Sequence, residues 1–143
     1  MFIFSFKKLK AFLFLLLLFI FFACKTGNKK VTEKFADGSP KTIQYIMSDS
    51  TIKETAFYQN HTKRYEGEYK HGQRNGHWIY WYEDGKVWSE GYFNMGENDS
   101  IRIVYHQNGN KYYSGKYRKG KRVGIWKFWD NDGNFVKQID YGQ

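Results

Sequence analysis

The 143-residue chain has a single cysteine, Cys24, so it can form no intramolecular disulfide. Leucine is also missing from most of it, because every leucine lies within the first 18 residues. Helices are rich in Ala and Leu, whereas the Tyr, Trp, Phe, Val and Ile that populate residues 24–143 favour strands. The length allows one small domain, and we expect that domain to be all-β.

The amino terminus is the exception to this composition. Three lysines precede twelve unbroken apolar residues, 11–22. A membrane-spanning helix needs roughly 20 such residues. A basic start followed by a shorter apolar run is typical of a secretory signal peptide. An uncleaved N-terminal anchor is the alternative.

Cys24 favours the signal peptide. It directly follows Ala23 at the end of the apolar run and resembles the lipobox cysteine of bacterial lipoproteins. The resemblance implies cleavage before Cys24 and lipidation of its thiol, and two or three acyl chains hold a protein at a membrane stably. We therefore predict a lipoprotein signal peptide (1–23), a polar tether (24–34) and a repeat domain (35–143).

The repeat domain contains one pattern three times, at a spacing of 24 residues: WYEDGKVWSEGYF (81–93), YHQNGNKYYSGKY (105–117) and WDNDGNFVKQIDY (129–141). Asp-Gly or Asn-Gly inside an alternating segment is a strong hairpin signal and predicts a two-residue type I′ loop. Such a loop makes three apolar pairs beside the tips, Trp81–Trp88, Tyr105–Tyr112 and Trp129–Val136. It makes three pairs further out, Trp78–Gly91, Arg102–Gly115 and Trp126–Ile139.

The same register divides the side chains between two faces. One face is expected to carry Trp78, Tyr80, Tyr82, Val87 and Phe93; the other is expected to carry Ile79, Trp81, Trp88 and Tyr92. Both faces are aromatic, so either neighbouring repeats protect each other's rings or an uncovered strip binds a partner. The candidate partner-binding aromatics are Trp81, Trp88, Tyr105, Tyr112 and Trp129.

A second glycine turn alternates with the first, at Gly72, Gly96 and Gly120, and keeps the same period. An earlier copy opens with FADGSPK (35–41), and its continuation, 42–60, is less regular. Stacked repeats of this kind bury one another's surfaces, and terminal copies are often atypical.

These motifs together resemble the MORN repeat in its bacterial variant form, although His61 and Ser100 stand where glycine is usual and Arg102 stands where tryptophan is usual. The resemblance implies an extended single-layer antiparallel sheet of consecutive hairpins. Many bacterial members are named YwqK-type antitoxins, and eukaryotic relatives are described as membrane-associated or scaffolding modules.

The chain offers little material for catalysis. Its four histidines have neither a second cysteine nor the spacing of a zinc site, which needs three or four converging ligands. Glu66 and Glu68 are the best carboxylate pair, but an open sheet gives them little burial. No nucleophile elbow or phosphate loop is present. We predict no enzyme, metal, cofactor or small-molecule substrate.

A basic run occupies 116–122, and the formal net charge of +9 falls to +6 without the signal-peptide lysines. Its cations are Lys116, Arg118, Lys119, Lys121 and Arg122. They predict either a solvated loop or contact with anionic lipid headgroups; an exported protein does not routinely meet nucleic acid, so none is expected as a partner.

The sequence thus predicts a non-catalytic interaction or scaffold module at the bacterial cell envelope, attached to a membrane through Cys24. The periplasmic side is favoured, with surface exposure as the alternative. The binding partner is expected to be a protein. Two other functions stay open: an antitoxin or immunity protein that masks a toxin, and a glycan-binding protein that stacks sugars on its tryptophans.

Overall fold

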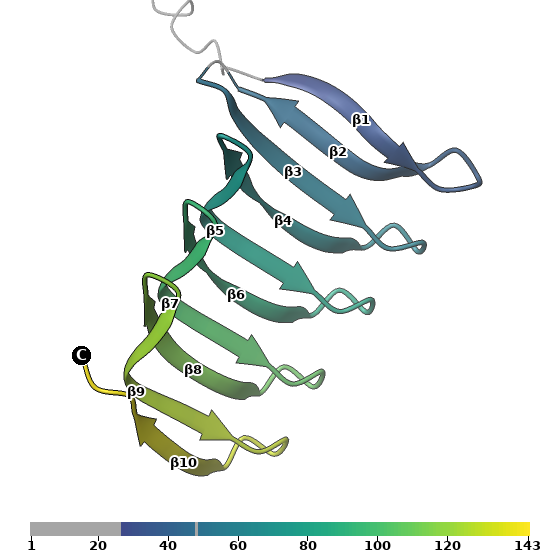
Figure 1. Cartoon of the computed structure of the whole chain (residues 1–143). Helices are drawn as coiled ribbons and strands as arrows, with labels where there is room; N and C mark the ends of the chain where they lie inside the picture. Colours follow the sequence, from purple (N-terminus) through teal and green to yellow (C-terminus); the bar gives the residue numbers. More distant parts are fainter. Residues whose placement is uncertain (1–26, 48) are drawn as a thin grey trace, which may run out of the picture.

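The computed structural model describes residues 27–47 and 49–143, which form one sheet of ten antiparallel strands (Figure 1). Each strand pairs with its neighbours in sequence, which confirms the expected all-β sheet of consecutive hairpins. The strands are β1 (Asn28–Lys34), β2 (Pro40–Ile46), β3 (Thr51–Phe57), β4 (Lys63–Lys70), β5 (Gln73–Trp81), β6 (Val87–Asn94), β7 (Glu97–Tyr105), β8 (Lys111–Arg118), β9 (Lys121–Trp129) and β10 (Phe135–Asp140).

The amino-terminal predictions meet the structure only in part. The expected signal peptide and Cys24 lie outside the described residues. Residues 28–34, expected to belong to a tether, form β1 and pair with β2. The less regular stretch 42–60 contributes residues 42–46 to β2 and 51–57 to β3. Across the described part of the chain there is no helix with the length and hydropathy to span a bilayer.

The tips with Asp-Gly and Asn-Gly carry three-residue loops. Between β5 and β6, the Tyr82 N–H donates to the Lys86 carbonyl (2.8 Å) and the Gly85 N–H donates to the Tyr82 carbonyl (3.0 Å). Gly85 has a φ of 86°, but Asp84 does not have positive φ, so the expected type I′ turn is wrong. The Asp84 carboxylate instead accepts the Lys86 N–H (3.0 Å), which explains why Asp or Asn recurs here.

The extra loop residue shifts the register beside each tip, so the three apolar pairs expected there are wrong. The observed pairs are Trp81–Val87, Tyr105–Lys111 and Trp129–Phe135. A bulge in the following strand then restores the expected register, and the outer pairs are confirmed: Trp78–Gly91, Arg102–Gly115 and Trp126–Ile139.

The bulge also changes the faces of two residues, because a one-residue slip turns a side chain to the other side of a sheet. Val87 pairs with Trp81 and so does not share a face with Trp78, as was expected. The Trp88 ring contacts Tyr80 and Tyr82, with ring centroids 6.0 and 6.3 Å apart, so the expected separation of Trp88 from these two residues is also wrong.

Two-residue loops lie at the opposite ends of β4–β5, β6–β7 and β8–β9. Both central residues of each loop have positive φ: His71-Gly72, Met95-Gly96 and Lys119-Gly120. This is the signature of a type I′ turn. The type I′ turns therefore lie at the end of the sheet away from the Asp-Gly tips.

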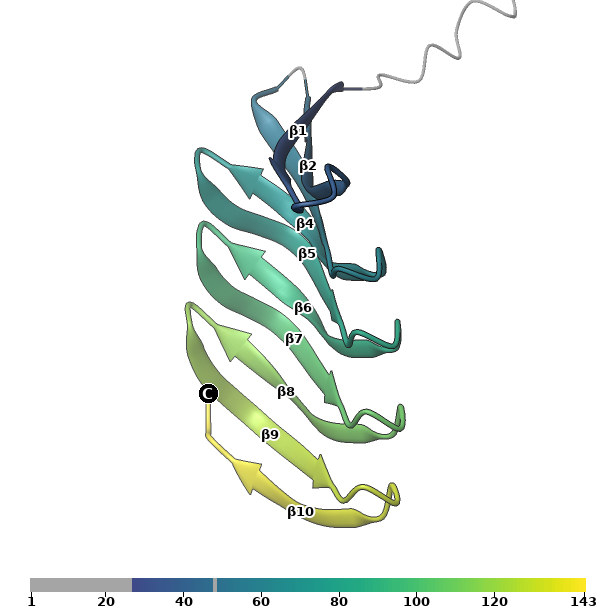
Figure 2. The same ribbon diagram turned by 90° about the vertical axis from the view of Figure 1, so that its right-hand side faces the viewer.

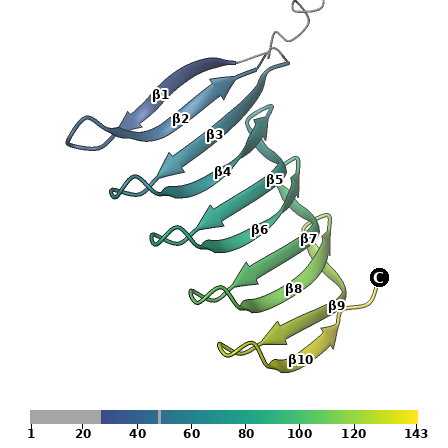
Figure 3. The same ribbon diagram turned by 180° about the vertical axis from the view of Figure 1, so that it is seen from behind.

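A bulge near the start of β5, β7 and β9 bends the sheet, as Figures 1 and 3 show, and Figure 2 shows the resulting curvature. In β5, the residues from Gly76 to Trp78 all oppose one residue of β4, Gly67. Gly76 has a φ of 69°, and the equivalent Ser100 and Gly124 have φ of 60° and 62°. The bend brings rings from both arms of the sheet together, so that one layer can bury large side chains.

The two buried tryptophans lie inside this bend. Trp78 is 1% exposed and Trp126 is fully buried. The Trp78 indole covers Gly67, where an added Cβ would overlap the ring. Its Nε1 donates to the Glu68 carbonyl at 3.2 Å, and the Tyr69 ring meets it edge-on at 5.1 Å. The sheet therefore builds its core from rings on glycine backbone.

Candidate functional site

The two faces of the sheet differ in how much surface they leave open. We call packed the face that carries Trp78, Ser89, Arg102 and Trp126, because its own rings and the bend cover it. We call the other face open. Its side chains include Lys53, Glu66, His77, Ile79, Glu90, Tyr92, Ile101, Ile103 and Ile125.

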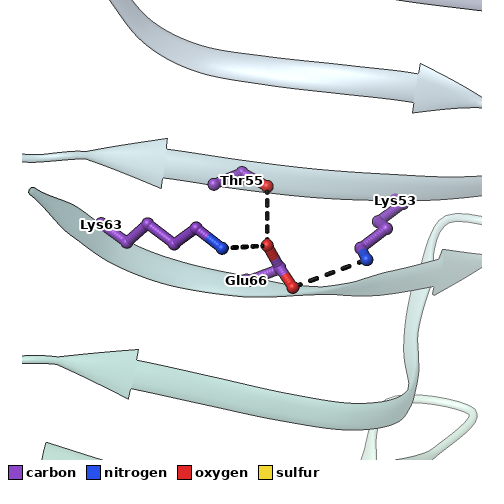
Figure 4. A network of polar contacts seen from close by, with 4 residues as sticks. All are labelled: Lys53, Thr55, Lys63 and Glu66. Atoms are coloured by element: carbon purple, nitrogen blue, oxygen red, sulfur yellow. Dashed lines mark hydrogen bonds and ion pairs between the residues drawn. The ribbon is translucent and has the colours of Figure 1, made fainter. Parts of the chain in front are cut away.

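A polar network occupies the open face over β3 and β4 (Figure 4). The Glu66 carboxylate accepts hydrogen bonds from Lys63 Nζ at 2.8 Å and Thr55 Oγ1 at 3.3 Å, and Lys53 Nζ lies 3.5 Å away. Burial disfavours the charged carboxylate, but the hydrogen bond from Lys63 and the charges of Lys53 and Lys63 outweigh it and lower the pKa of Glu66. The network therefore holds two cations around one anion.

A groove of about 420 Å³ runs beside this network. One wall is apolar and contains Ile43, Tyr45, Met47 and Phe57; the other holds Lys53, Lys63, Thr55 and Glu66. The carboxylate is ion-paired with Lys53 and Lys63, and it is the one carboxylate among the described residues that line this groove.

A second polar group follows on β5 to β7. His77 Nε2 lies 3.5 Å from the Glu90 carboxylate, and the Tyr105 hydroxyl donates to Glu90 at 2.8 Å. Burial, together with the hydrogen bond and the charge of Glu90, raises the pKa of Tyr105 to about 12, so the phenol keeps the proton it donates. The His77 ring stacks on Tyr92 at 4.8 Å.

Apolar side chains between and beyond these groups are exposed. Tyr92 is 47% exposed, Ile101 56% and Ile125 51%. Tyr92 and Ile101 form a shallow hollow with Ile103 and His77. We call Tyr92, Ile101 and Ile125 the apolar row. Its members come from β6, β7 and β9, and Lys116, which pairs with Ile101, lies on β8 between Ile101 and Ile125.

The five predicted aromatics do not form a single site. Trp81, Tyr105 and Trp129 occupy equivalent positions on the open face and are half-buried. Trp88 and Tyr112 are the bulge residues; Tyr112 contacts the His106 ring at 4.8 Å between centroids, as Trp88 contacts Tyr82 at 6.3 Å, both with tilted rings. The aromatics are thus in two separate rows.

Lysine side chains cover part of the first row. Lys63 Nζ lies 5.5 Å from the Trp81 ring centroid, and Lys111 Nζ lies 5.9 Å from that of Trp129. A sugar that stacks on either indole would have to compete with these cations.

The predicted cations gather around one turn. Lys116, Arg118, Lys119 and Lys121 are exposed at and near the β8–β9 loop. Arg122 is used in the fold: its guanidinium lies 4.5 Å from the Trp126 ring centroid and donates to the Tyr141 hydroxyl at 2.8 Å. That hydrogen bond raises the pKa of Arg122.

The network around Glu66 and the apolar row are the features that sequence reasoning missed. Glu66 was considered only as a partner of Glu68, whereas its observed partners come from β3 and from Lys63. A signal existed, because Glu66 and Glu90 are 24 residues apart and both hold cationic or polar partners on the same face. Within the described residues no three His, Cys, Asp or Glu side chains converge as metal ligands would.

Comparison with known proteins identifies no matching family model and no curated relative of this chain.

Proposed function

We propose that this chain is a non-catalytic interaction module that binds a protein through its open face and is held at a bacterial envelope membrane by a lipidated Cys24. The apolar row carries the proposal. Large exposed apolar side chains gathered on one face often mark an interaction site, and polar groups border this row on its β4–β6 side, as in the apolar core and polar rim of protein interfaces. The MORN-like hairpin repeat supports a scaffolding role.

The packed face supports the choice of the open face. Trp78, Phe93 and Trp126 on that face are already buried by the chain itself, so a partner would gain little apolar contact from them. The exposed apolar side chains of the open face, by contrast, still have surface that a partner could bury.

The test is affinity capture of tagged full-length protein from native membranes after cross-linking. We expect one protein to be recovered in stoichiometric amount, and to be lost from an Ile101→Asp/Ile125→Asp variant. A Trp88→Ala/Tyr112→Ala variant, altered at the two bulge residues, should still capture that protein. The same difference should appear as at least a tenfold loss of affinity with the purified partner. Equal capture by all three proteins would contradict the proposal.

The same experiment distinguishes the two alternatives. A toxin as the captured protein makes the chain an antitoxin, and deletion of the chain should then harm cells only when that toxin is present. Recovery of glycan alone, lost in a Trp81→Ala/Trp129→Ala variant, would make it a glycan-binding protein and refute the protein-binding proposal.

Membrane attachment needs its own test. Cys24→Ser should release the protein from the membrane fraction or leave an unprocessed precursor, while Ser5→Ala, a polar change within the expected signal peptide, should leave attachment intact. Unchanged processing and attachment of the Cys24→Ser protein would refute lipidation.

A further inference from the structure

The two edge strands of the sheet differ in how they discourage pairing with another strand. β1 carries Lys29, Lys30 and Lys34, and its pairing with β2 is interrupted by two register shifts. Lysines and bulges are common devices that block an exposed sheet edge. β10 has one lysine and pairs regularly from Lys137 to Asp140, and its Phe135 and Val136 are each 57% exposed. The unprotected edge is therefore β10.

β10 is unsuited to a further repeat of the same kind. Each indole that covers the sheet needs a glycine beneath it on the preceding strand, as Gly67 and Gly115 lie beneath Trp78 and Trp126. The equivalent residue of β10 is Ile139. The strand that pairs with β10 must therefore be different from the inner strands.

The series of hydrogen bonds between successive tips also ends at the last hairpin. In two inner tips the first residue donates to a backbone carbonyl beside the next tip: Tyr58 to Trp81 and Tyr82 to Tyr105, both at 2.8 Å. In the last tip this residue is Asp130, whose carboxylate accepts the N–H of Asn134 at 2.8 Å instead. Without a donor, the last tip cannot extend the series in the same direction.

The two ends of β10 lie beside opposite charges. The acidic tip, Asp130 and Asp132, precedes the start of β10. The basic turn, Arg118, Lys119, Lys121 and Arg122, lies at the end of the sheet where β10 finishes, because β9 begins there and runs antiparallel to β10. Asp140 at that end accepts the Gly142 N–H at 2.9 Å, and the cations outnumber it.

We propose that the partner of β10 is the β10 strand of a second copy, paired antiparallel about a two-fold axis. The antiparallel arrangement places each acidic tip beside the basic turn of the other copy, twice by symmetry. It joins two ten-stranded sheets into one continuous sheet and presents two open faces on the same side.

The register is limited by charge and by the alternation of faces. Pairing centred on Lys137 would oppose two ammonium groups, which destabilises a strand pair. Centring on Gln138 or on Ile139 avoids this and keeps the packed faces of both copies on one side. Pairing with β1 of another copy is disfavoured, because it would bring Lys29 and Lys30 beside the basic turn and Asp37 beside the acidic tip.

A cross-linking experiment on the full-length protein in detergent tests the interface. Gln138→Cys and Ile139→Cys are each oxidised mildly, and the linked peptides are identified by mass spectrometry. We expect one of the two variants to give a dimer linked through the substituted position, since a disulfide requires Cα atoms within about 7 Å. Val31→Cys, on the β1 edge, is the control and should give none. No linked dimer at 138 or 139, or an equal yield at 31, would overturn the proposal.

Charge reversal tests the antiparallel orientation by sedimentation equilibrium at low salt. Asp132→Lys and Lys121→Asp should each weaken the dimer by about three- to tenfold, because two surface contacts per dimer turn repulsive. The combined variant should recover most of the affinity. Both side chains are exposed in the described structure, so folding should be unaffected, as circular dichroism can confirm. A monomer at every concentration, or a combined variant as weak as the sum of the single ones, would overturn the pairing.

Discussion

Three repeats cover a strand glycine with a large side chain, but they use different residues to do so. We call the repeats of Trp78 and Trp126 the outer repeats and the repeat of Arg102, which lies between them, the middle repeat. In the outer repeats the indoles of Trp78 and Trp126 cover Gly67 and Gly115, and no Cβ would fit beneath them. In the middle repeat Arg102 occupies the tryptophan position, and a Cβ on the glycine below it would meet Arg102 Cγ at 3.4 Å, which is ordinary contact. The glycine is sterically required only where the covering group is an indole.

The residues around the tryptophan position also differ between the middle repeat and the outer repeats. In the outer repeats the guanidinium groups of Arg74 and Arg122 lie 5.0 and 4.5 Å from the indole centroids. The middle repeat has Asn98 there, and its oxygen accepts from Arg102 Nη1 at 3.2 Å. Arg102 Nη2 donates to the fully buried Ser89 hydroxyl at 3.3 Å. In the middle repeat the arginine thus occupies the tryptophan position itself, and its planar guanidinium covers the sheet in place of the indole.

The largest effect should come from removing the covering side chain. Trp78→Ala or Trp126→Ala should cost about 3–5 kcal/mol of unfolding free energy, as large buried aromatics do. Arg102→Ala should cost about 1–3 kcal/mol, mainly because it leaves the buried Ser89 hydroxyl without its partner. Urea unfolding followed by circular dichroism measures all three, with exposed Trp88→Ala as a mild control. Equal losses for Trp78→Ala and Arg102→Ala would contradict the distinction between the repeats.

The next largest difference between the repeats should appear when the covered glycine is replaced by alanine. Gly67→Ala and Gly115→Ala should each cost about 1–3 kcal/mol, because the new methyl group displaces the indole. Gly91→Ala should stay within about 0.5 kcal/mol, because the Arg102 side chain is flexible and already at contact distance. Thermal unfolding provides the comparison. A Gly91→Ala protein as unstable as Gly67→Ala would mean that the backbone, and not the indole, imposes the glycine.

The middle repeat should be convertible into an outer one. The triple change Ser89→Tyr, Asn98→Arg and Arg102→Trp restores the residue types of the outer repeats above Gly91. We expect it to stabilise the protein by about 1 kcal/mol through added aromatic contacts. Arg102→Trp alone should gain less, since it lacks the neighbouring ring and cation. A less stable triple variant in urea unfolding would show that Gly91 and its strand are adapted to arginine.

The smallest effect concerns the cations above the rings. Arg74→Gln should cost about 0.5–1 kcal/mol, as expected of a cation–π contact near the surface. Arg122→Gln should cost somewhat more, because Arg122 also donates to Tyr141. Exposed Lys121→Gln is the matched control for lost charge. If Lys121→Gln lowers the melting temperature as much as Arg74→Gln, general electrostatics and not ring contact would explain the loss.

The sequence by itself determined the order of the hairpins from Gly72 onward and the register away from the tips. The 24-residue spacing of Asp-Gly, Asn-Gly and the second glycine turn marks every chain reversal from Gly72 onward, and Trp78–Gly91 and Trp126–Ile139 pair as expected. Such signals are local, because a glycine at positive φ and an Asp that accepts a nearby N–H act within a few residues.

Only the tertiary structure decided the loop length at the tips, the bend and the division into packed and open faces. Both a two-residue and a three-residue loop suit Asp84-Gly85, and the choice depends on the bulge that places Trp88 against Tyr80 and Tyr82. The partners of Glu66 are Lys63 on its own strand and side chains of β3, whose copy of the repeat lacks the glycines. Contacts between separate strands decide these features, because side-chain packing across the bend selects among backbone arrangements that the local sequence allows equally.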